Sequence, residues 1–325
     1  MNNSHEALRE QITKSQQLII IPHQHPDGDA MGSATALFGY LTSLGKNVTM
    51  YCATPTNPKW QFLTHADKLS TDPAIFSEPT VDTIIVLDSG DLRYAGVEAL
   101  VKNHPAFIIN IDHHATNEYF GKLNIVDPGT ASTTNVLFHL FEALGVPFTK
   151  EMATSLLTGL ITDTDNFTNA ATTPDAMAAA SVLVKAGGDL KTINDLMTRN
   201  KSIDSLKLWG KVLSRLQKHD ALDLTYTYIT KNDIEEAHVN EAESEGIANF
   251  LNNLGDTKIA LILKETLDGK IKGSFRTIRD DVDVSAIAKQ MGGGGHRRAA
   301  GFTTDGTINE VLNKIITASD DPKNK

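Results

Sequence analysis

Three short apolar runs in the first third of the chain each lead into carboxylates or imidazoles, and this repetition limits the folds that the chain can adopt. Leu18 to Ile21, Val81 to Leu87 and Ala106 to Ile111 are rich in β-branched residues and too short for buried helices, so they predict buried strands. Turn or helix signals follow, as at Gly28 and Gly90. Strands that alternate with helices predict a parallel sheet with helices on both faces, an α/β fold.

The polar residues that follow these runs are predicted to meet. In an open parallel sheet the carboxyl ends of the strands share one edge, and ligands bind beyond that edge. Carboxylates and imidazoles together suit divalent cations, and the set is too large for one ion, so we expect two ions about 3.5–4 Å apart. Manganese is the preferred ion, with magnesium, iron, cobalt and zinc as alternatives. The candidate residues are His23, Asp27, Asp29, Asp88, Asp112, His113, His114 and Asp163.

The remaining periodicity predicts the organisation of the chain. We expect an α/β metal-binding domain over 1–188, a helical linker over 189–218 and a smaller α+β domain over 219–325. In the first domain the predicted helices are 4–14, 30–44, 92–102, 132–144, 150–161 and 175–186, and the additional strands are 48–52 and 123–126.

The last third of the chain has a different pattern. Strands are predicted at 221–230, 258–265 and 270–277, with a hairpin at Asp268-Gly269, and helices at 243–254 and 284–291. The glycine run at 292–295 precedes His296 and Arg297. Glycines allow backbone N–H groups to surround an anion, so we expect a phosphate-binding nest there. Arg276 suits phosphate because its guanidinium is planar and forked.

Charge and cysteine content exclude several classes of function. The 325 residues include 30 basic and 40 acidic side chains, a formal net charge of −10, which disfavours binding of long duplex nucleic acid. Cys52 is the only cysteine, so disulfides and multi-cysteine zinc sites are excluded. The N-terminus lacks the apolar core of a signal peptide and no run is long enough to span a membrane. We therefore expect a soluble cytoplasmic protein.

Several ordered motifs resemble those of one family of hydrolases. The segments HQHPDGD, LDSGDLR, IDHH and GLITDTDNF resemble the motifs of DHH phosphoesterases, and GGGGHRRAAG resembles the signature of their associated C-terminal domain. The resemblance runs from about Leu18 to Phe302 and is greatest to small two-domain members. These members are nanoRNases that also act as 3′-phosphoadenosine 5′-phosphate (pAp) phosphatases, or hydrolases of cyclic-di-AMP and its linear product pApA. Gln24-His25 departs from the commonest pattern, so the role of His25 stays open.

The resemblance also implies roles for individual residues. Asp88 would bridge the two ions, Asp112 would orient an imidazole, and His114 would contact the scissile phosphate or protonate the leaving oxygen. The other implied ligands are His23 and Asp27 for one ion, and Asp29, His113 and Asp163 for the other. The implied substrate-binding residues are Arg93, Arg276, Gly293, Gly294, Gly295, His296 and Arg297.

The resemblance implies two-metal hydrolysis of phosphoester bonds in short nucleotides. The partners would be short oligoribonucleotides, pAp, pApA or cyclic-di-AMP, and the oligomeric state stays open, with a homodimer as one possibility. A cyclic-di-AMP or pApA phosphodiesterase, an inorganic pyrophosphatase and a non-catalytic nucleotide sensor are the alternatives. A complete set of ligands for two ions argues against the sensor, since binding alone does not need two ions.

Overall fold

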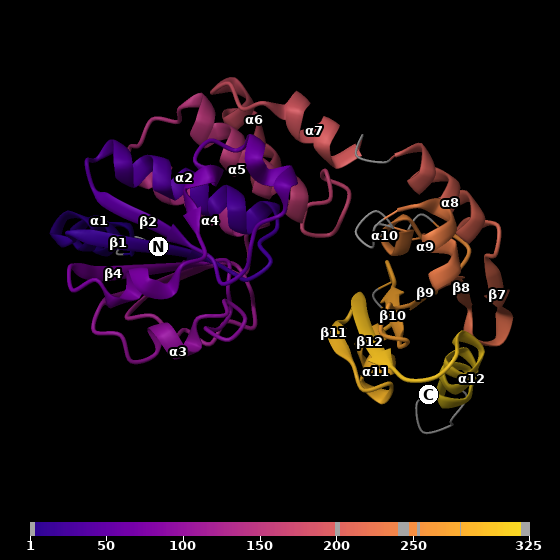
Figure 1. Cartoon of the computed structure of the whole chain (residues 1–325). Helices are drawn as coiled ribbons and strands as arrows, with labels where there is room; N and C mark the ends of the chain where they lie inside the picture. The colour runs from indigo at the N-terminus through magenta and orange to yellow at the C-terminus, as the bar shows by residue number, and fades with distance from the viewer. Residues whose placement is uncertain (1–3, 199–201, 240–246, 252–253, 280, 320–325) are drawn as a thin grey trace. The chain divides into compact units, whose positions relative to one another are not determined.

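The chain folds into two compact units. The computed structural model describes residues 4–198, 202–239, 247–251, 254–279 and 281–319. Contacts divide the chain into Met1–Arg199 and Asn200–Lys325, which are described separately (Figure 1). Among the described residues, no helix is both long and apolar enough to cross a membrane.

The region predicted as a helical linker, 189–218, contains two helices that pack in different units. Helix α7, Leu190–Thr198, packs in the first unit because Ile193 is buried in that unit's core. Helix α8, Ile203–Leu213, packs in the second unit through Leu208 and Val212. Each helix therefore contributes apolar contacts to its own unit, and the pattern that suggested a linker is that of two amphipathic core helices.

The first unit contains a six-stranded sheet in the order β3-β2-β1-β4-β5-β6, in which every neighbouring pair is parallel. The chain moves outward from β1 to β3 and then returns to the other side of β1 with β4. The α/β prediction is thus confirmed. The strands are β1 Gln17–Pro22, β2 Asn47–Tyr51, β3 Leu69–Ser70, β4 Val81–Leu87, β5 Phe107–Asp112 and β6 Leu123–Val126.

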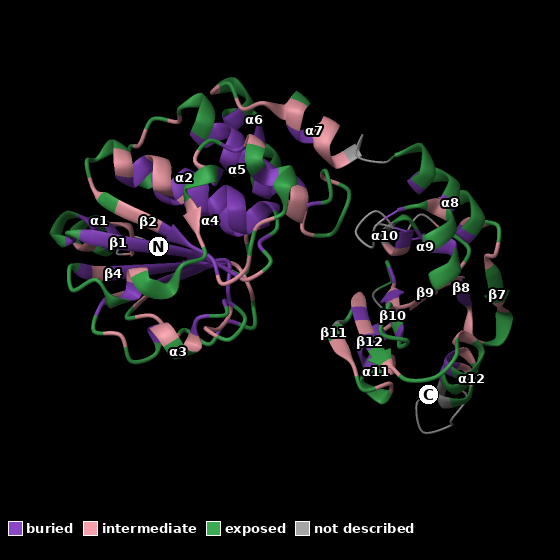
Figure 2. Ribbon diagram, in the orientation of Figure 1, coloured by how far each residue is buried: buried purple, intermediate pink, exposed green. Residues whose placement is uncertain are grey.

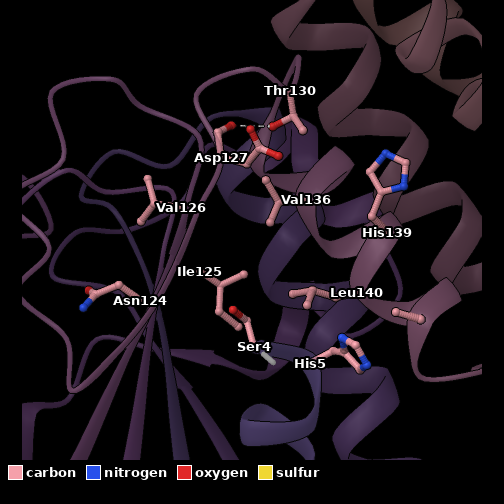
Figure 3. Close-up of a pocket in the computed structure, with 11 residues that line it drawn as sticks. Ser4, His5, Asn124, Ile125, Val126, Asp127, Thr130, Val136, His139 and Leu140 are labelled. Carbon is pink, nitrogen blue, oxygen red and sulfur yellow. Dashed lines mark hydrogen bonds between the residues drawn. The ribbon is translucent and has the colours of Figure 1, made fainter. Parts of the chain in front are cut away.

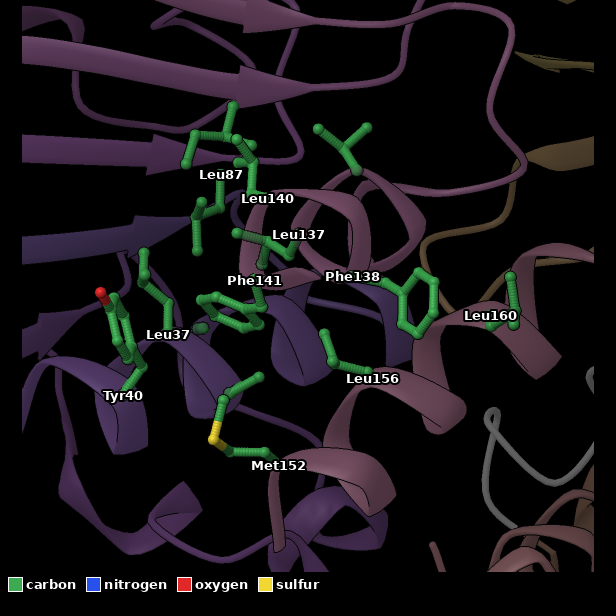
Figure 4. Close-up of a cluster of buried hydrophobic side chains, with 14 of the residues drawn as sticks. Leu37, Tyr40, Leu87, Leu137, Phe138, Leu140, Phe141, Met152, Leu156 and Leu160 are labelled. Carbon is green, nitrogen blue, oxygen red and sulfur yellow. The ribbon is translucent and has the colours of Figure 1, made fainter. Parts of the chain in front are cut away.

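Alternating strand residues pack into two separate apolar clusters, one on each face of this sheet. Leu18 and Ile20 pack with the long helices, whereas Ile19 and Ile21 pack with turns and short helices on the opposite face. Figure 4 shows the larger cluster, and Figure 2 shows the buried strands between the two faces. The helices are α1 Ser4–Lys14, α2 Gly28–Ser43, α3 Glu98–Val101, α4 Thr133–Ala143, α5 Lys150–Asp163 and α6 Pro174–Lys185; the 3₁₀ helices are η1 Pro58–Phe62, η2 Ala66–Lys68 and η3 Pro73–Ser77.

One predicted helix of the first unit is mostly absent. Only α3 forms within the predicted range 92–102. The Asp91 carboxylate accepts the N–H groups of Arg93 and Tyr94, which is a turn typical of aspartate, and Gly96 then adopts φ +74°. These local bonds compete with the helical pattern that the apolar spacing suggested.

The second unit contains a mixed six-stranded sheet in the order β11-β12-β10-β9-β8-β7. Only β8 and β9 run parallel. Helices α11 and α12 cover one face, and α8, α9 and α10 contribute to the cluster on the other face. The bounds are β7 Gln217–His219, η4 Asp220–Leu222, β8 Leu224–Ile229, α9 Lys231–Ala237, α10 Ile247–Phe250, β9 Ile259–Glu265, β10 Ile271–Arg276, α11 Val284–Gln290, β11 Gly294–His296, β12 Ala299–Thr304 and α12 Ile308–Ser319.

The predictions for this α+β unit hold where the structure can be compared with them. The hairpin at Asp268-Gly269 is confirmed, since β9 and β10 pair antiparallel around it and Gly269 adopts φ +82°. Of the helix predicted at 243–254, α10 is helical, while 243–246 and 252–253 lie outside the described residues.

Candidate metal centre

The register of the first sheet brings three polar residues to the same level. Pro22 pairs with Leu87, and Leu87 pairs with Ile111. His23, Asp88 and Asp112 come next along these strands, so they begin level at the carboxyl edge of the sheet. The strand order reverses between β1 and β4, which is where parallel sheets leave a crevice for ligands. His23 and Asp88 therefore lie at the position that the topology favours for a site.

Helices α2 and α5 bring three more carboxylates to this edge. Asp27 caps α2, since its Oδ1 accepts the N–H groups of Asp29 at 2.9 Å and Ala30 at 3.1 Å. Asp29 lies in the first helical turn and is fully buried. Asp163 is the last residue of α5. A Cβ at Gly28 would lie 2.4 Å from the Thr162 methyl group, so glycine allows the two helix ends to approach closely.

Asp88 faces two imidazoles with its two oxygens. His23 Nε2 lies 3.6 Å from Asp88 Oδ2 and 3.7 Å from Asp27 Oδ1. His113 Nε2 lies 3.8 Å from Asp88 Oδ1 and 3.3 Å from Asp163 Oδ2. Two atoms that each bind one ion at about 2.1 Å are at most about 4.2 Å apart. The spacing is therefore suitable for an ion on each side of Asp88.

Three groups of residues have ligand atoms within 4.8 Å of one another among the described residues. Two of the groups together contain the six ligands expected from the sequence. The third contains His114, so the geometry also allows this histidine to approach an ion. The groups are His23, Asp27 and Asp88; Asp29, His113 and Asp163; and Asp88, His113 and His114.

Asp112 connects the two neighbouring histidines through hydrogen bonds. Its Oδ1 lies 2.7 Å from His114 Nδ1 and accepts the His113 N–H at 2.8 Å. Its Oδ2 accepts an N–H of the Asn117 amide at 2.5 Å. Asp112 is fully buried, whereas the His114 side chain is 33% exposed. The carboxylate thus orients the His114 ring and leaves it accessible at the surface of the centre.

Residue Thr133, which the sequence predictions did not include, contacts two of the candidate ligands. Its N–H donates to Asp29 Oδ2 at 2.6 Å and its hydroxyl donates to Asp88 Oδ1 at 2.9 Å. The Thr134 N–H donates to Asp29 Oδ1 at 2.8 Å. These amides begin α4, whose positive end favours a carboxylate. The Ser-Thr-Thr sequence at the start of the predicted helix was the signal that could have indicated these contacts.

The centre has an excess of negative charge in a buried place. Burial first, and then the neighbouring carboxylates, raise the pKa values of Asp88 and Asp163 well above the ordinary aspartate value. Burial also raises the pKa of Asp29. Among the described residues, no lysine or arginine forms an ion pair with these three carboxylates. The donor set therefore fits divalent cations, which would supply the missing positive charge.

Two histidines of the centre, His23 and His114, also have raised pKa values, which favour their charged forms. Burial opposes protonation of His23, but its contact with Asp27 outweighs burial and raises its pKa. The hydrogen bond to Asp112 raises the pKa of His114. Burial likewise opposes ionisation of Asp27 and Asp112, but their histidine partners lower both pKa values. Each histidine and its carboxylate thus favour the charged forms of one another.

Two candidate residues of the first unit are not brought into the centre. The Arg93 guanidinium pairs with Glu118 at 2.8 Å and with Asp91 at 3.4 Å, and its side chain is 62% exposed. His25 is exposed, with φ +53°, and its N–H donates to Thr54 Oγ1. No contact among the described residues connects either side chain to the carboxylate group.

The glycine run of the second unit, predicted as a phosphate-binding nest, packs closely against neighbouring backbone. The N–H groups of Gly292 and Gly293 bond to carbonyls of α11, and β11 then pairs with β12. A Cβ at Gly293 would lie 2.1 Å from the Gly301 oxygen, and one at Gly295 would lie 2.6 Å from Ala300 Cα. These glycines are therefore explained by close packing of two strands.

Arg276 lies on the face of β10 opposite the α11 and α12 side. Ile271 and Phe275 pack with the α11 and α12 cluster, so the alternation of the strand directs Arg276 to the other face. Its cross-strand neighbours Ala299 and Ala260 are small. Burial lowers the pKa of Arg276. Arg297 lies in the turn between β11 and β12, and the side chain of His296 lies outside the described part of the structure.

A separate hollow of about 170 Å³ lies between α1, β6 and α4 (Figure 3). Its walls are mostly apolar, with Asp127 and Thr130 hydrogen-bonded at one end. None of the candidate ligands lines it, so it is distinct from the carboxylate centre.

Comparisons with known proteins identify the family. Residues 17–160 match the N-terminal domain of the DHH family, and residues 223–321 match the DHHA1 domain. The bifunctional oligoribonuclease and PAP phosphatase NrnA of Thermus thermophilus is 35% identical, over 93% of this chain and 88% of that protein.

Two further proteins are similar to this chain, one in sequence and one in solved structure. The cyclic-di-AMP phosphodiesterase GdpP of Geobacillus thermodenitrificans is 28% identical over 97% of this chain and 49% of that protein. A crystal structure of an exopolyphosphatase-related protein from Bacteroides fragilis has a TM-score of 0.92 at 24% identity, covering 98% of this chain and 96% of that one. The motifs, the domains and the similarity to NrnA together show that the chain belongs to the DHH family of phosphoesterases.

Proposed function

We propose that this protein hydrolyses phosphoester bonds in short nucleotides with two divalent metal ions, acting as a nanoRNA exoribonuclease and as a pAp phosphatase. The observation that carries the proposal is the position of Asp88, whose two oxygens face two different histidines. Two ions close together suit phosphoryl chemistry. The 35% identity to an oligoribonuclease and PAP phosphatase supports the choice of substrate.

The proposed ligands follow the two sides of Asp88. His23, Asp27 and Asp88 would hold one ion, while Asp29, His113 and Asp163 would hold the other with Asp88. Manganese is the proposed metal because the donors mix oxygen with imidazole nitrogen. When bound, the ions supply Lewis acidity toward a phosphate group and toward water.

The chain's own residues would supply proton transfer and orientation. Asp112 holds Nδ1 of His114 at 2.7 Å, which leaves Nε2 of the same ring to donate to a phosphate or leaving oxygen. Its raised pKa favours the protonated ring needed for this role. Thr133 keeps Asp29 and Asp88 in fixed positions before any ligand arrives.

The second unit would contribute residues that bind phosphate groups of a nucleotide. Arg276 and Arg297 provide forked donors for phosphate, and Gly293 to Gly295 keep side chains away from the adjacent backbone. His296 completes this proposed set. Arg93 would join it only after leaving its ion pairs with Asp91 and Glu118. Substitution of Arg276 by lysine should raise KM for pAp, because lysine cannot donate a bidentate pair.

A competition assay tests the proposed function. The manganese-loaded protein is given equal amounts of pAp, pApA, cyclic-di-AMP, pyrophosphate and RNA of two to five nucleotides, and the order of disappearance is followed by chromatography. We expect pAp and short RNA to disappear first, and we expect a separate incubation with long duplex to leave the duplex largely intact. Loss of pyrophosphate ahead of every nucleotide, or binding of nucleotides without hydrolysis in any divalent metal, would overturn the proposal.

A second candidate is a cyclic-di-AMP or pApA phosphodiesterase. The match to GdpP, which covers 97% of this chain, favours this alternative. The same assay separates the two functions, because a phosphodiesterase of this kind should consume cyclic-di-AMP or pApA before pAp.

A further inference from the structure

The turn that follows Asp88 holds a tyrosine beside the metal centre. The N–H groups of Arg93 and Tyr94 both donate to Asp91 Oδ1 at 2.7 Å. On the other side, Ala95 and Val97 are buried in the smaller apolar cluster of the sheet. The backbone of Tyr94 is therefore held from both directions, which limits where its side chain can reach.

The ring of Tyr94 lies against the imidazole of His23. The two ring centroids are 5.0 Å apart, with an angle of 39° between the planes. The His23 side chain is only 5% exposed, whereas Tyr94 is 50% exposed. Tyr94 thus covers part of a candidate ligand and leaves half of its own surface open to an incoming molecule.

The hydroxyl of Tyr94 is available as a hydrogen-bond donor. A phenol carries its proton at neutral pH. Within the described ranges of the chain, the hydroxyl forms no hydrogen bond to protein. Arg93, its neighbour, is already paired with Asp91 and Glu118.

We propose that the Tyr94 hydroxyl donates a hydrogen bond to a phosphate oxygen of the bound nucleotide and so helps to orient the substrate at the centre. This inference rests on the proposed function, because it assumes a phosphorylated substrate beside His23. A neutral donor is suitable here, since it binds a phosphate oxygen without competing with the cations for the carboxylates. The contact would make Tyr94 a residue for substrate recognition.

The test compares wild type with Tyr94→Phe in the full chain loaded with manganese. Isothermal titration with pAp and initial rates of pAp hydrolysis should both show a loss of about tenfold in Tyr94→Phe, in Kd and in kcat/KM, as expected for one hydrogen bond to a charged group. Manganese affinity should stay unchanged, because phenylalanine keeps the ring that packs on His23. Tyr226→Phe is the matched control, since it removes a hydroxyl of the second unit that, among the described residues, bonds only to Gln217.

The outcomes separate this inference from the function on which it rests. Equal pAp binding and kcat/KM in wild type and Tyr94→Phe would overturn the inference and leave the proposed function intact. A manganese affinity that falls as much as pAp affinity would also overturn it, because Tyr94 would then act only through His23. Wild-type protein that neither binds nor hydrolyses pAp, but hydrolyses another nucleotide, moves the same comparison to that nucleotide. Absence of binding and hydrolysis for every nucleotide would overturn both proposals.

Discussion

Two buried aspartates, one in each unit, have opposite surroundings. Asp88 and Asp233 are each 2% exposed. The Asp88 carboxylate lies among other carboxylates, which together with burial raise its pKa. Burial also opposes ionisation of Asp233, but hydrogen bonds from Arg215 and Lys211 outweigh it and lower the pKa of that carboxyl.

The comparison shows how each unit compensates a buried charge. Asp233 receives two N–H groups of the Arg215 guanidinium and a contact of 2.8 Å from Lys211 Nζ, and it also caps α9. Its positive partners are supplied by the chain itself. Among the described residues, the groups that can offset the charge of Asp88 are imidazoles and the Thr133 hydroxyl, so bound cations would supply the remaining compensation. A buried carboxylate without an internal cation is thus a sign of function more than of stability.

The largest predicted effect is the loss of activity when Asp88 loses its charge. Asp88→Asn keeps the side-chain shape and tolerates the left-handed φ of +55°, but it removes the bridging carboxylate. We expect kcat on pAp to fall by at least about a thousandfold. Asp165→Asn, an exposed position in the segment after α5, serves as the control and should retain activity. Turnover near the wild-type rate in Asp88→Asn would contradict the role of Asp88.

The second effect is stabilisation by metal. Ions that bind only the folded first unit should raise its free energy of unfolding by about 2.7 kcal/mol at a free manganese concentration of one hundred times Kd. Thermal denaturation of chelator-treated protein with and without manganese measures this change. In Asp233→Asn, manganese should raise the free energy of unfolding of the first unit by the same amount, because Asp233 forms its ion pairs in the second unit. An unfolding transition that manganese does not shift would refute the fit of the centre to cations.

The third effect is the loss of the ion pair in the second unit. Asp233→Asn should lower the free energy of unfolding of that unit by about 2 kcal/mol, since Arg215 and Lys211 lose a charged acceptor. Chemical denaturation followed by circular dichroism measures the loss. Asp204→Asn is the control and should change stability little, because Asp204 is an exposed residue of α8 that, among the described residues, forms an ion pair only with Lys207.

The two units should also differ in pH dependence. The folded pKa of Asp233 is lowered, so its contribution is present above the unfolded value of about 3.9 and is lost as pH falls below that value. The folded pKa values of Asp88 and Asp163 are raised, so in chelator-treated protein their contribution is present below about pH 3.9 and is lost as pH rises toward the folded values. Unfolding is measured at pH 3, 5 and 7 with chelator. From pH 3 to pH 7 the free energy of unfolding should rise for the second unit and fall for the first. The same trend in both units would contradict the opposite surroundings of Asp88 and Asp233.

A smaller effect is expected at Thr133. Thr133→Val keeps the β-branched shape and the N–H that binds Asp29 but removes the hydroxyl that donates to Asp88. Metal affinity should fall about tenfold, the lower end for partners of metal ligands. Thr42→Val is the control, because the Thr42 hydroxyl donates to the carbonyls of Phe38 and Gly39 near the end of α2 and not to a candidate ligand. Equal manganese titrations of the two variants would show that the Thr133 hydroxyl has no role.

The smallest predicted effect is a substitution that stabilises the protein, whereas most substitutions destabilise it. In metal-free protein, Asp88→Asn removes a charge that burial and neighbouring carboxylates disfavour, so the first unit should become more stable by about 1 kcal/mol at pH 7. Asp233→Asn should do the opposite in the second unit. If Asp88→Asn lowered the stability of the first unit in the presence of chelator, groups of the chain itself would have to stabilise the charge of Asp88 without metal.

Much of the fold could be predicted because its signals are local. The strand Val81–Leu87 and the helix Ser4–Lys14 were predicted at their observed bounds, since apolar spacing decides them. The helix over 92–102 failed because Asp91 and Gly96 create a turn that periodicity does not reveal. The close packing at the glycine run could not be predicted, because the approach of β11 and β12 depends on tertiary pairing.

In the candidate site, too, residues marked by local signals could be predicted, whereas residues placed by tertiary contacts could not. His23 and Asp88 could be identified because they directly follow predicted strands, and topology places strand ends together. Thr133 could not, because its hydrogen bonds to Asp29 and Asp88 depend on how α4 packs on α2. The role proposed for Tyr94 could not be predicted from the sequence either, since its contact with His23 depends on the turn at Asp91.

The most direct test of the central claim is the electron paramagnetic resonance spectrum of the protein with two equivalents of manganese. Two ions bridged by Asp88 at about 3.5–4 Å should give the spectrum of a spin-coupled pair. Asp88→Asn should replace it with the six-line signal of isolated Mn²⁺. A six-line signal alone in the wild type, at full occupancy of two ions, would contradict a dinuclear centre.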